Sequence, residues 1–186
     1  MNRRTLLAAL AALPLLPRGA EAAEAGEAGH RVAVDGFTFT VPPGWKPIDP
    51  GRSQGTVDHL GLWIQGQYAD QAFIALDRDV DPGDNLASFE LETENALRAR
   101  LTKVFVDSRD RIQMPNGMPA MRLKVEYLAG DSEVLYQQYI WLIYDGVIGV
   151  VLSMGGRVGR ISLEEATQLA STLKVVWRGD GPPPAP

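Results

Sequence analysis

The chain has 186 residues, of which 45% are hydrophobic and 22% charged, and its formal net charge at pH 7 is -5. This length predicts one domain with a sizeable core, and the acidic balance argues against partners that present phosphate backbones or anionic headgroups, so we expect no nucleic-acid binding. The chain has no cysteine, which excludes disulfides, thiolate catalysis, Cys-ligated zinc and a lipid-modified N-terminal cysteine.

The N-terminus has the pattern of a cleavable export signal over residues 1–22. A positive start, an Ala/Leu-rich run too short to cross a bilayer and a small-residue cleavage site follow one another there. The adjacent Arg3 and Arg4 leave both the general secretory route and the twin-arginine route open. We therefore expect a periplasmic or secreted protein without stable membrane insertion, in which residues 23–30 are a flexible spacer and residues 31–177 the folded domain.

The first part of this domain is predicted to consist of strands. A hairpin is expected over residues 31–41, because alternating apolar residues flank the turn dipeptide Asp35-Gly36. Residues 46–57 are rich in Pro, Gly, Ser and Asp and predict a long surface loop. Two further strands are expected at residues 60–64 and 73–76.

Two segments have the periodicity of amphipathic helices. Residues 85–104 place apolar side chains at steps of three and four, with Asp84 as the expected N-cap. Residues 162–175 do the same, and Ser162 with Glu165 forms the pattern of a capping box. Both segments are therefore predicted to be helices that pack one apolar face on a sheet.

Between these helices the sequence predicts an antiparallel meander. Its strands are expected at residues 109–114, 121–128, 134–144 and 147–154. Residues 139–143 are apolar on both faces, which indicates a central strand covered on both sides. Residues 178–186 form a Gly/Pro tail that we expect to be disordered. The order of strands, helix, meander and helix predicts an α+β fold, an antiparallel sheet flanked by helices.

Three segments carry a resemblance to a known family. Residues 37–45 (FTFTVPPGW) are similar to a first strand with its Pro-Gly-Trp stop, residues 139–152 to an aromatic-rich hairpin, and residues 166–176 to a closing helix. Together they resemble the PsbP/Mog1/DcrB-like superfamily. The resemblance implies an α/β/α sandwich and an accessory or binding module. Together with the export signal, it leads us to expect a non-enzymatic module without a cofactor that engages a protein partner in the periplasm. The absence of a lipobox cysteine departs from the DcrB-type pattern.

An acidic cluster suggests a metal site as the alternative function. Asp77, Asp79, Asp81 and Asp84 supply carboxylates at alternate or nearby positions, which is a ligand pattern that calcium accepts. The segment lacks the glycine and glutamate that an EF-hand requires at fixed positions. The competing interpretation is a polar turn whose acidic side chains cap the following helix.

Two more segments have both a binding and a purely structural interpretation. Met114, Met118 and Met121 surround a tight turn and could bind copper(I), or they could fill irregular gaps in the core. Residues 155–160 (GGRVGR) precede a helix and could hold an anion, or they could form a plain connection. Either a metal ion or a small ligand thus remains the alternative to a protein partner.

The sequence contains no recognisable catalytic set. His30 and His59 are the only histidines, and no serine stands in a nucleophile elbow, so we expect no enzymatic activity.

The remaining candidates for a binding site are aromatic. Trp45, Trp63 and Tyr68 lie beside the predicted surface loop, and tryptophan and tyrosine are common anchors of protein interfaces. We therefore expect these three residues to form the partner-binding surface.

Overall fold

The computed structural model describes residues 29–34, 37–51, 57–67, 70–128, 133–144 and 146–175. Within these ranges an antiparallel seven-stranded sheet has the order β3-β4-β5-β9-β8-β7-β6. Its strands are β3 (Lys46–Ile48), β4 (Val57–Gln65), β5 (Ala72–Asp79), β6 (Thr102–Gln113), β7 (Pro119–Leu128), β8 (Leu135–Tyr144) and β9 (Gly149–Arg157). A smaller sheet has the order β1-β2-β10, and its strands are β1 (His30–Val34), β2 (Phe37–Val41) and β10 (Lys174–Val175).

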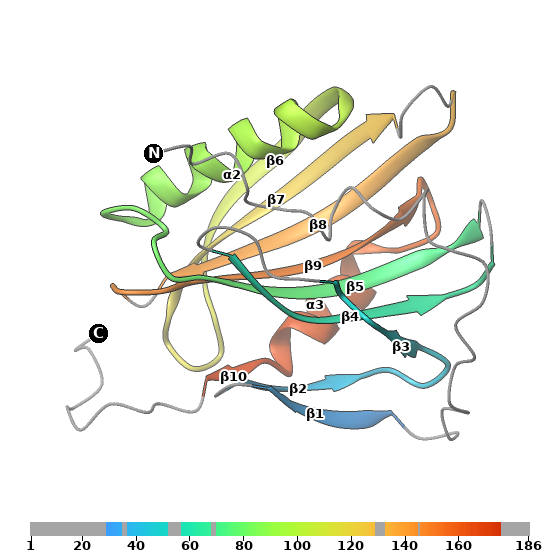
Figure 1. The fold of residues 1–186 in the computed structure, drawn as a ribbon, viewed down its shortest axis with the longest axis horizontal. Coiled ribbons are helices and arrows are strands. Elements are labelled where there is room, and N and C mark those ends of the chain that lie inside the picture. Colours follow the sequence, from blue (N-terminus) through green and yellow to red (C-terminus); the bar gives the residue numbers. More distant parts are fainter. Residues whose placement is uncertain are drawn as a thin grey trace.

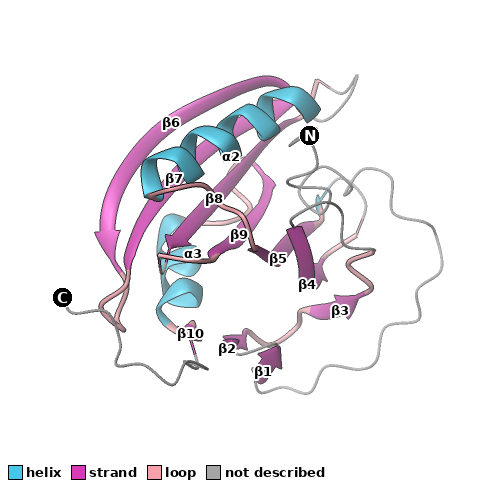
Figure 2. Ribbon diagram, turned by 60° about the vertical axis from the view of Figure 1, so that its left-hand side comes forward, coloured by secondary structure: helices cyan, strands magenta, loops and turns pink. Residues whose placement is uncertain are grey.

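The two helices cover opposite faces of the large sheet. Helix α2 (Leu86–Arg100) contacts β6, β7 and β8 on one face (Figure 1). Helix α3 (Leu163–Ser171) lies against the other face, where it contacts β2 and β8 (Figure 2). Each helix has its own cluster of buried apolar residues, one on each side of the sheet. The chain is therefore an α+β sandwich with helices on both faces of an antiparallel sheet, as the sequence predicts.

Strand β8 shows why this arrangement follows from the sequence. Tyr139, Trp141 and Ile143 belong to the apolar cluster beside α3, whereas Ile140 and Leu142 belong to the cluster beside α2. Successive side chains of a strand point to opposite faces, so a strand that is apolar at every position must be covered on both sides. All five residues are buried, which confirms the predicted double-sided burial.

Three sheet glycines lie beneath aromatic rings. A Cβ at Gly61 would lie 2.2 Å from the ring of Trp63, and one at Gly149 would lie 2.5 Å from the ring of Phe89. The third is Gly155, where a Cβ would lie 2.7 Å from the ring of Phe73. These glycines serve close ring-to-backbone packing.

The boundaries of α2 differ from the prediction. Asn85, not Asp84, is the N-cap: its Oδ1 accepts hydrogen bonds from the backbone N–H groups of Ala87 and Ser88. The helix ends at Arg100 because Leu101 is extended and Lys103 has a left-handed φ of 51°. Residues 102–104, which the sequence predicts as the end of the helix, thus begin β6.

The left-handed Lys103 gives a testable prediction about this junction. Replacing Lys103 with glycine is expected to raise the free energy of unfolding by about 0.5–1 kcal/mol, because glycine adopts positive φ without steric cost. Urea denaturation measures the difference. Arg111→Gly, at another exposed position of β6, is the matched control and is expected to be destabilising by about the same amount. A loss of stability in Lys103→Gly would contradict the strained conformation.

Helix α3 starts where the sequence predicts but ends earlier, and a short strand follows it. Ser162 and Glu165 form the predicted capping box, and the hydrogen bonds from the backbone and side chain of Ser162 lower the pKa of the Glu165 carboxyl. The helix stops at Ser171 instead of continuing to residue 175, and β10 then pairs with β2. The chain therefore returns to the first hairpin.

Other expectations have mixed outcomes. The predicted hairpin forms, with Val34 paired to Phe37. The predicted loop over residues 46–57 instead starts with strand β3, and residues 52–56 lie outside the described residues. The described residues also leave out the export signal at 1–22, the spacer at 23–28 and the tail at 178–186. Of the predicted spacer they include only Gly29 and His30, and His30 belongs to β1. No helix in the described part of the chain is long and apolar enough to cross a membrane.

Candidate functional site

The two tryptophans that the sequence suggested as partner anchors are in the core. Trp45 is 3% exposed and Trp63 is 4% exposed. The Trp63 ring packs edge-on against Phe39 at 5.1 Å between centroids and covers Gly61. The expectation that these rings form a binding surface is therefore wrong, because packing between the two sheets uses both of them. Tyr68 lies outside the described residues.

The four aspartates do not form a cation site. Asp77 and Asp79 are buried within β5, whereas Asp81 and Asp84 are exposed beyond its end. Asp79 Oδ1 accepts a hydrogen bond from the backbone N–H of Asp81. Among the residues that the structure describes, no group of three or more His, Cys, Asp or Glu side chains could hold a metal ion. The acidic spacing thus reflects a strand end and the turn after it.

The methionines and the Gly-rich segment also have structural roles. Met114 and Met118 pack in the cluster beside α3, whereas Met121 packs in the cluster beside α2, so the three thioethers do not converge. Gly155 and Gly156 are buried strand residues of β9. The N-terminus of α3 is occupied by the Glu165 carboxylate of its own capping box. None of these groups is arranged as the copper or anion site that the sequence left open.

A buried His–Asp pair is the feature that the sequence did not reveal. His59 and Asp77 face each other across β4 and β5, and His59 Nδ1 lies 2.8 Å from Asp77 Oδ1. Each side chain is 1% exposed. Burial raises the pKa of the Asp77 carboxyl, and the hydrogen bond to His59 opposes this shift. A substrate cannot reach this pair unless the core opens.

The buried Asp77 carboxyl predicts a pH dependence of stability. Its folded-state pKa is raised above its ordinary value of 3.8, so the folded state binds a proton at this carboxyl more tightly than the unfolded chain does. The contribution of Asp77 to stability is then greatest at low pH and declines as pH rises from the unfolded pKa through the folded pKa. Asp77→Asn lacks this decline.

We therefore expect the stability of Asp77→Asn, relative to the unsubstituted protein, to increase between pH 4 and pH 7. Urea denaturation at both pH values measures the change. Asp110→Asn is the control, because Asp110 is half-exposed and paired with Arg122 on the sheet surface. A relative stability of Asp77→Asn that falls over the same range would contradict the raised pKa.

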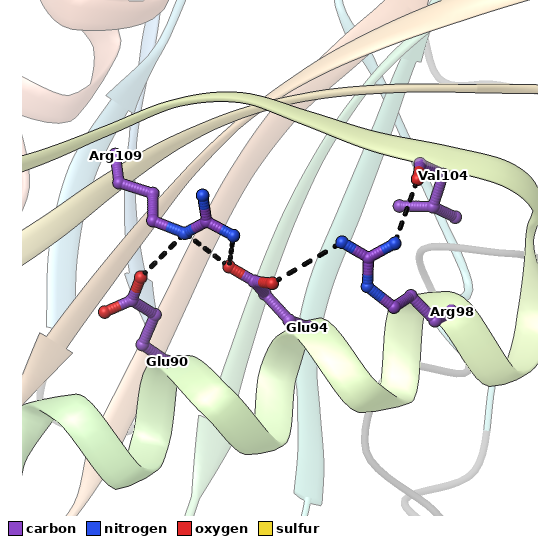
Figure 3. Close-up of polar contacts among 5 residues, drawn as sticks. All are labelled: Glu90, Glu94, Arg98, Val104 and Arg109. Atoms are coloured by element: carbon purple, nitrogen blue, oxygen red, sulfur yellow. Dashed lines mark hydrogen bonds and ion pairs between the residues drawn. The ribbon is translucent and has the colours of Figure 1, made fainter.

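A network of charges joins α2 to β6 at the surface. Arg109 of β6 lies with Nε 3.2 Å from Glu90 Oε1 and with Nη2 2.6 Å from Glu94 Oε1 (Figure 3). Arg98 lies with Nη2 3.7 Å from Glu94 Oε2 and donates a hydrogen bond from Nη1 to the backbone carbonyl of Val104 at 3.1 Å (Figure 3). These contacts fix the position of α2 over the strand, although each exposed pair stabilises the fold by only about 0–1 kcal/mol.

Strand β6 is a long edge of the large sheet. It has twelve residues and pairs only with β7 within the described ranges, whereas β3 at the opposite edge has three residues and includes Pro47. Its first half has two register shifts, between Thr102 and Phe105 and between Val106 and Ser108. Residues 108–113 pair regularly. An edge of this kind presents backbone donors and acceptors that a further strand can use.

Exposed apolar side chains flank this edge on both sides of the sheet. Leu91 of α2 is 60% exposed and borders a hollow of about 270 Å³ that Arg109 also lines. Phe105 is 64% exposed and pairs across the sheet with Glu126. Val125 and Tyr127 face α2, so Glu126 and Phe105 point to the other side. We call residues 108–113 of β6, together with Leu91 and Phe105, the β6 edge site.

The fold recurs in solved structures of low sequence identity. LpqN of Mycobacterium tuberculosis, described as involved in cell envelope biogenesis, has a TM-score of 0.53 and 17% identity, covering 81% of this chain and 87% of LpqN. A protein of Bacteroides thetaiotaomicron has a TM-score of 0.50 and 17% identity, covering 78% of this chain. This chain spans 47% of that protein's length. No family model and no curated protein matches the sequence.

Proposed function

We propose that this chain is an exported, non-enzymatic accessory module of the cell envelope that binds a protein partner through the β6 edge site. We also propose that it belongs to the PsbP/Mog1/DcrB-like superfamily, with which its two-sided α+β sandwich is consistent. The similarity in fold to LpqN, described as involved in cell envelope biogenesis, supports the proposed location. The observation that carries the binding proposal is the long open edge of β6 with an exposed apolar side chain on each side.

The chemistry of the edge favours an extended segment of the partner. A partner strand that pairs with residues 108–113 would gain main-chain hydrogen bonds, and its alternate side chains would reach Leu91 on one side and Phe105 on the other. Arg109, Asp110 and Arg111 lie along the same edge. Charges on an edge strand oppose pairing with unmatched strands, which limits the partners that can add to this edge.

Site-specific photo-crosslinking in the native host tests this proposal. A photoreactive residue at Phe105 or at Leu91 is expected to capture the same partner protein. Leu163 is the matched control, because it is an exposed leucine on α3, on the opposite face of the sheet from α2. Crosslinks of equal strength from Leu163, or none from Phe105 and Leu91, would contradict the β6 edge site.

The absence of catalysis is tested separately. The purified protein is expected to show no turnover in screens for hydrolase and transferase activity. If turnover were found and were lost in both His59→Gln and Asp77→Asn while both variants remained folded, the buried pair would be a catalytic site and the proposed function would be wrong.

A further inference from the structure

Three polar side chains form a diagonal row across the centre of the sheet. Asp77 of β5 is opposite Val151, and Ser153 is the next residue of β9 on the same face. Ser153 is opposite Ile140, and Gln138 is the next residue of β8 on that face. Because neighbours on this face belong to the cluster beside α2, the three side chains lie on the α2 side of the sheet. We call Asp77, Ser153 and Gln138 the polar row.

The polar row is fully buried, and its polar atoms have few partners. All three residues are at most 1% exposed. Asp77 Oδ2, Ser153 Oγ and both side-chain polar atoms of Gln138 have no hydrogen-bond partner among the described residues. Thr93, on the sheet-facing side of α2, also has a buried hydroxyl without a hydrogen-bond partner among the described residues. Buried polar groups in folded proteins are nearly always hydrogen-bonded, since an unpaired one strongly lowers stability.

The side chains of the polar row are too far apart to hydrogen-bond directly to one another, and their spacing suits a bridging water molecule. Diagonal neighbours of an antiparallel sheet have Cα atoms about 7–8 Å apart, so short side chains such as Asp77 and Ser153 do not meet at hydrogen-bonding distance. A water molecule can donate to an unprotonated oxygen of the Asp77 carboxyl and accept from the serine hydroxyl. The amide of Gln138 offers both a donor and an acceptor to a second bridge. Internal waters commonly satisfy groups of this kind.

We infer that the polar row is a binding site for ordered internal water, in which water bridges Asp77 to Ser153 and Ser153 to Gln138. This site is separate from the β6 edge site and does not depend on the proposed function. It also gives the buried Asp77 carboxyl a second hydrogen-bonding partner besides His59.

Two measurements on the full chain test the inference. Oxygen-17 magnetic relaxation dispersion counts internal waters with long residence times, and we expect Gln138→Met or Ser153→Ala to lose at least one of them. The same substitutions are expected to lower Tm by about 2–4 °C, because a net hydrogen bond is lost in a domain of this size. Gln168→Met on the exposed face of α3 is the matched control and should change neither quantity.

The alternatives give different results. If no water is bound at the polar row, Gln138→Met removes an unpaired amide from the core. In that case Tm rises and the number of long-lived internal waters stays the same. If the side chains rearrange to bond directly to one another, Ser153→Ala lowers Tm without loss of a water. Either result would overturn the inference. Should Gln138→Met fail to fold, Ser153→Ala alone still separates these outcomes, because it only removes a hydroxyl.

Discussion

Substitution of Trp141 by alanine is expected to lower the free energy of unfolding by about 3–5 kcal/mol. The indole is 1% exposed and belongs to the apolar cluster between the large sheet, α3 and the small sheet. It is opposite Arg122 of β7 and Leu152 of β9. Its ring centroid lies 6.5 Å from the ring centroid of Tyr139. Removal of this side chain would leave a cavity that the paired strands cannot close, because their spacing is fixed by hydrogen bonds.

Urea denaturation measures the loss, with Phe105→Ala as the control. Phe105 is the most exposed aromatic residue of the described side chains, so its truncation is expected to change the free energy of unfolding by less than about 0.5 kcal/mol. A similar loss for both variants would mean that Trp141 does not occupy the core position assigned to it. It would equally contradict the exposure of Phe105 on which the β6 edge site depends.

The second large loss of stability is expected at Gly149, which lies under the Phe89 ring of helix α2. Gly149→Ala should lower the free energy of unfolding by about 1–3 kcal/mol, because the added methyl overpacks the core. Its Cβ would lie 2.5 Å from Phe89 Cζ and 2.8 Å from Pro82 Cβ. Both neighbours belong to α2 or to the segment that leads into it. The methyl group therefore forces either the ring or the start of the helix to move.

A double-mutant cycle tests this cause. In the background of Phe89→Leu, which removes the ring, Gly149→Ala is expected to be less destabilising than in the unsubstituted protein. Gly156→Ala is the control, because its Cβ would meet Ala72 at 3.3 Å, a much milder contact. Additive effects of Gly149→Ala and Phe89→Leu would show that the ring does not lie over Gly149.

Much of the fold could be predicted because its signals are local. The Asp35-Gly36 turn, the capping box at Ser162 and the apolar residues 139–143 each act over a few residues, and the structure has the expected hairpin, helix start and covered strand. The α2–β6 junction was placed wrongly because Leu101 and Val104 continue the helical spacing. The β-branched and aromatic residues that follow favour a strand, and this preference prevails once the chain reaches the sheet edge.

The site features could not be predicted because they depend on which strands become neighbours. His59 and Asp77 are brought together by the register of β4 and β5, which no sequence spacing encodes. Trp63 is expected to be exposed because it lies beside the predicted surface loop, but the small sheet covers its face. That β6 lies at the edge follows from the strand order of the whole sheet, to which all seven strands contribute.

A pair of proline substitutions can locate the partner on the β6 edge. Consecutive residues of a strand direct their N–H groups alternately to either side, so of Asp110 and Arg111 one donates toward β7 and the other toward the open edge. Proline at the outward position leaves the sheet intact but blocks an added strand. Proline at the inward position disrupts the pairing with β7 and lowers Tm.

Native mass spectrometry of the protein, gently purified from its native host, tests directly whether a partner strand adds to β6. We expect a complex with a second protein for the unsubstituted chain, and its loss in whichever of Asp110→Pro and Arg111→Pro keeps the original Tm. A complex that survives in that variant would contradict strand addition at β6. A bound metal or small-molecule mass in place of a protein would contradict the proposed function itself.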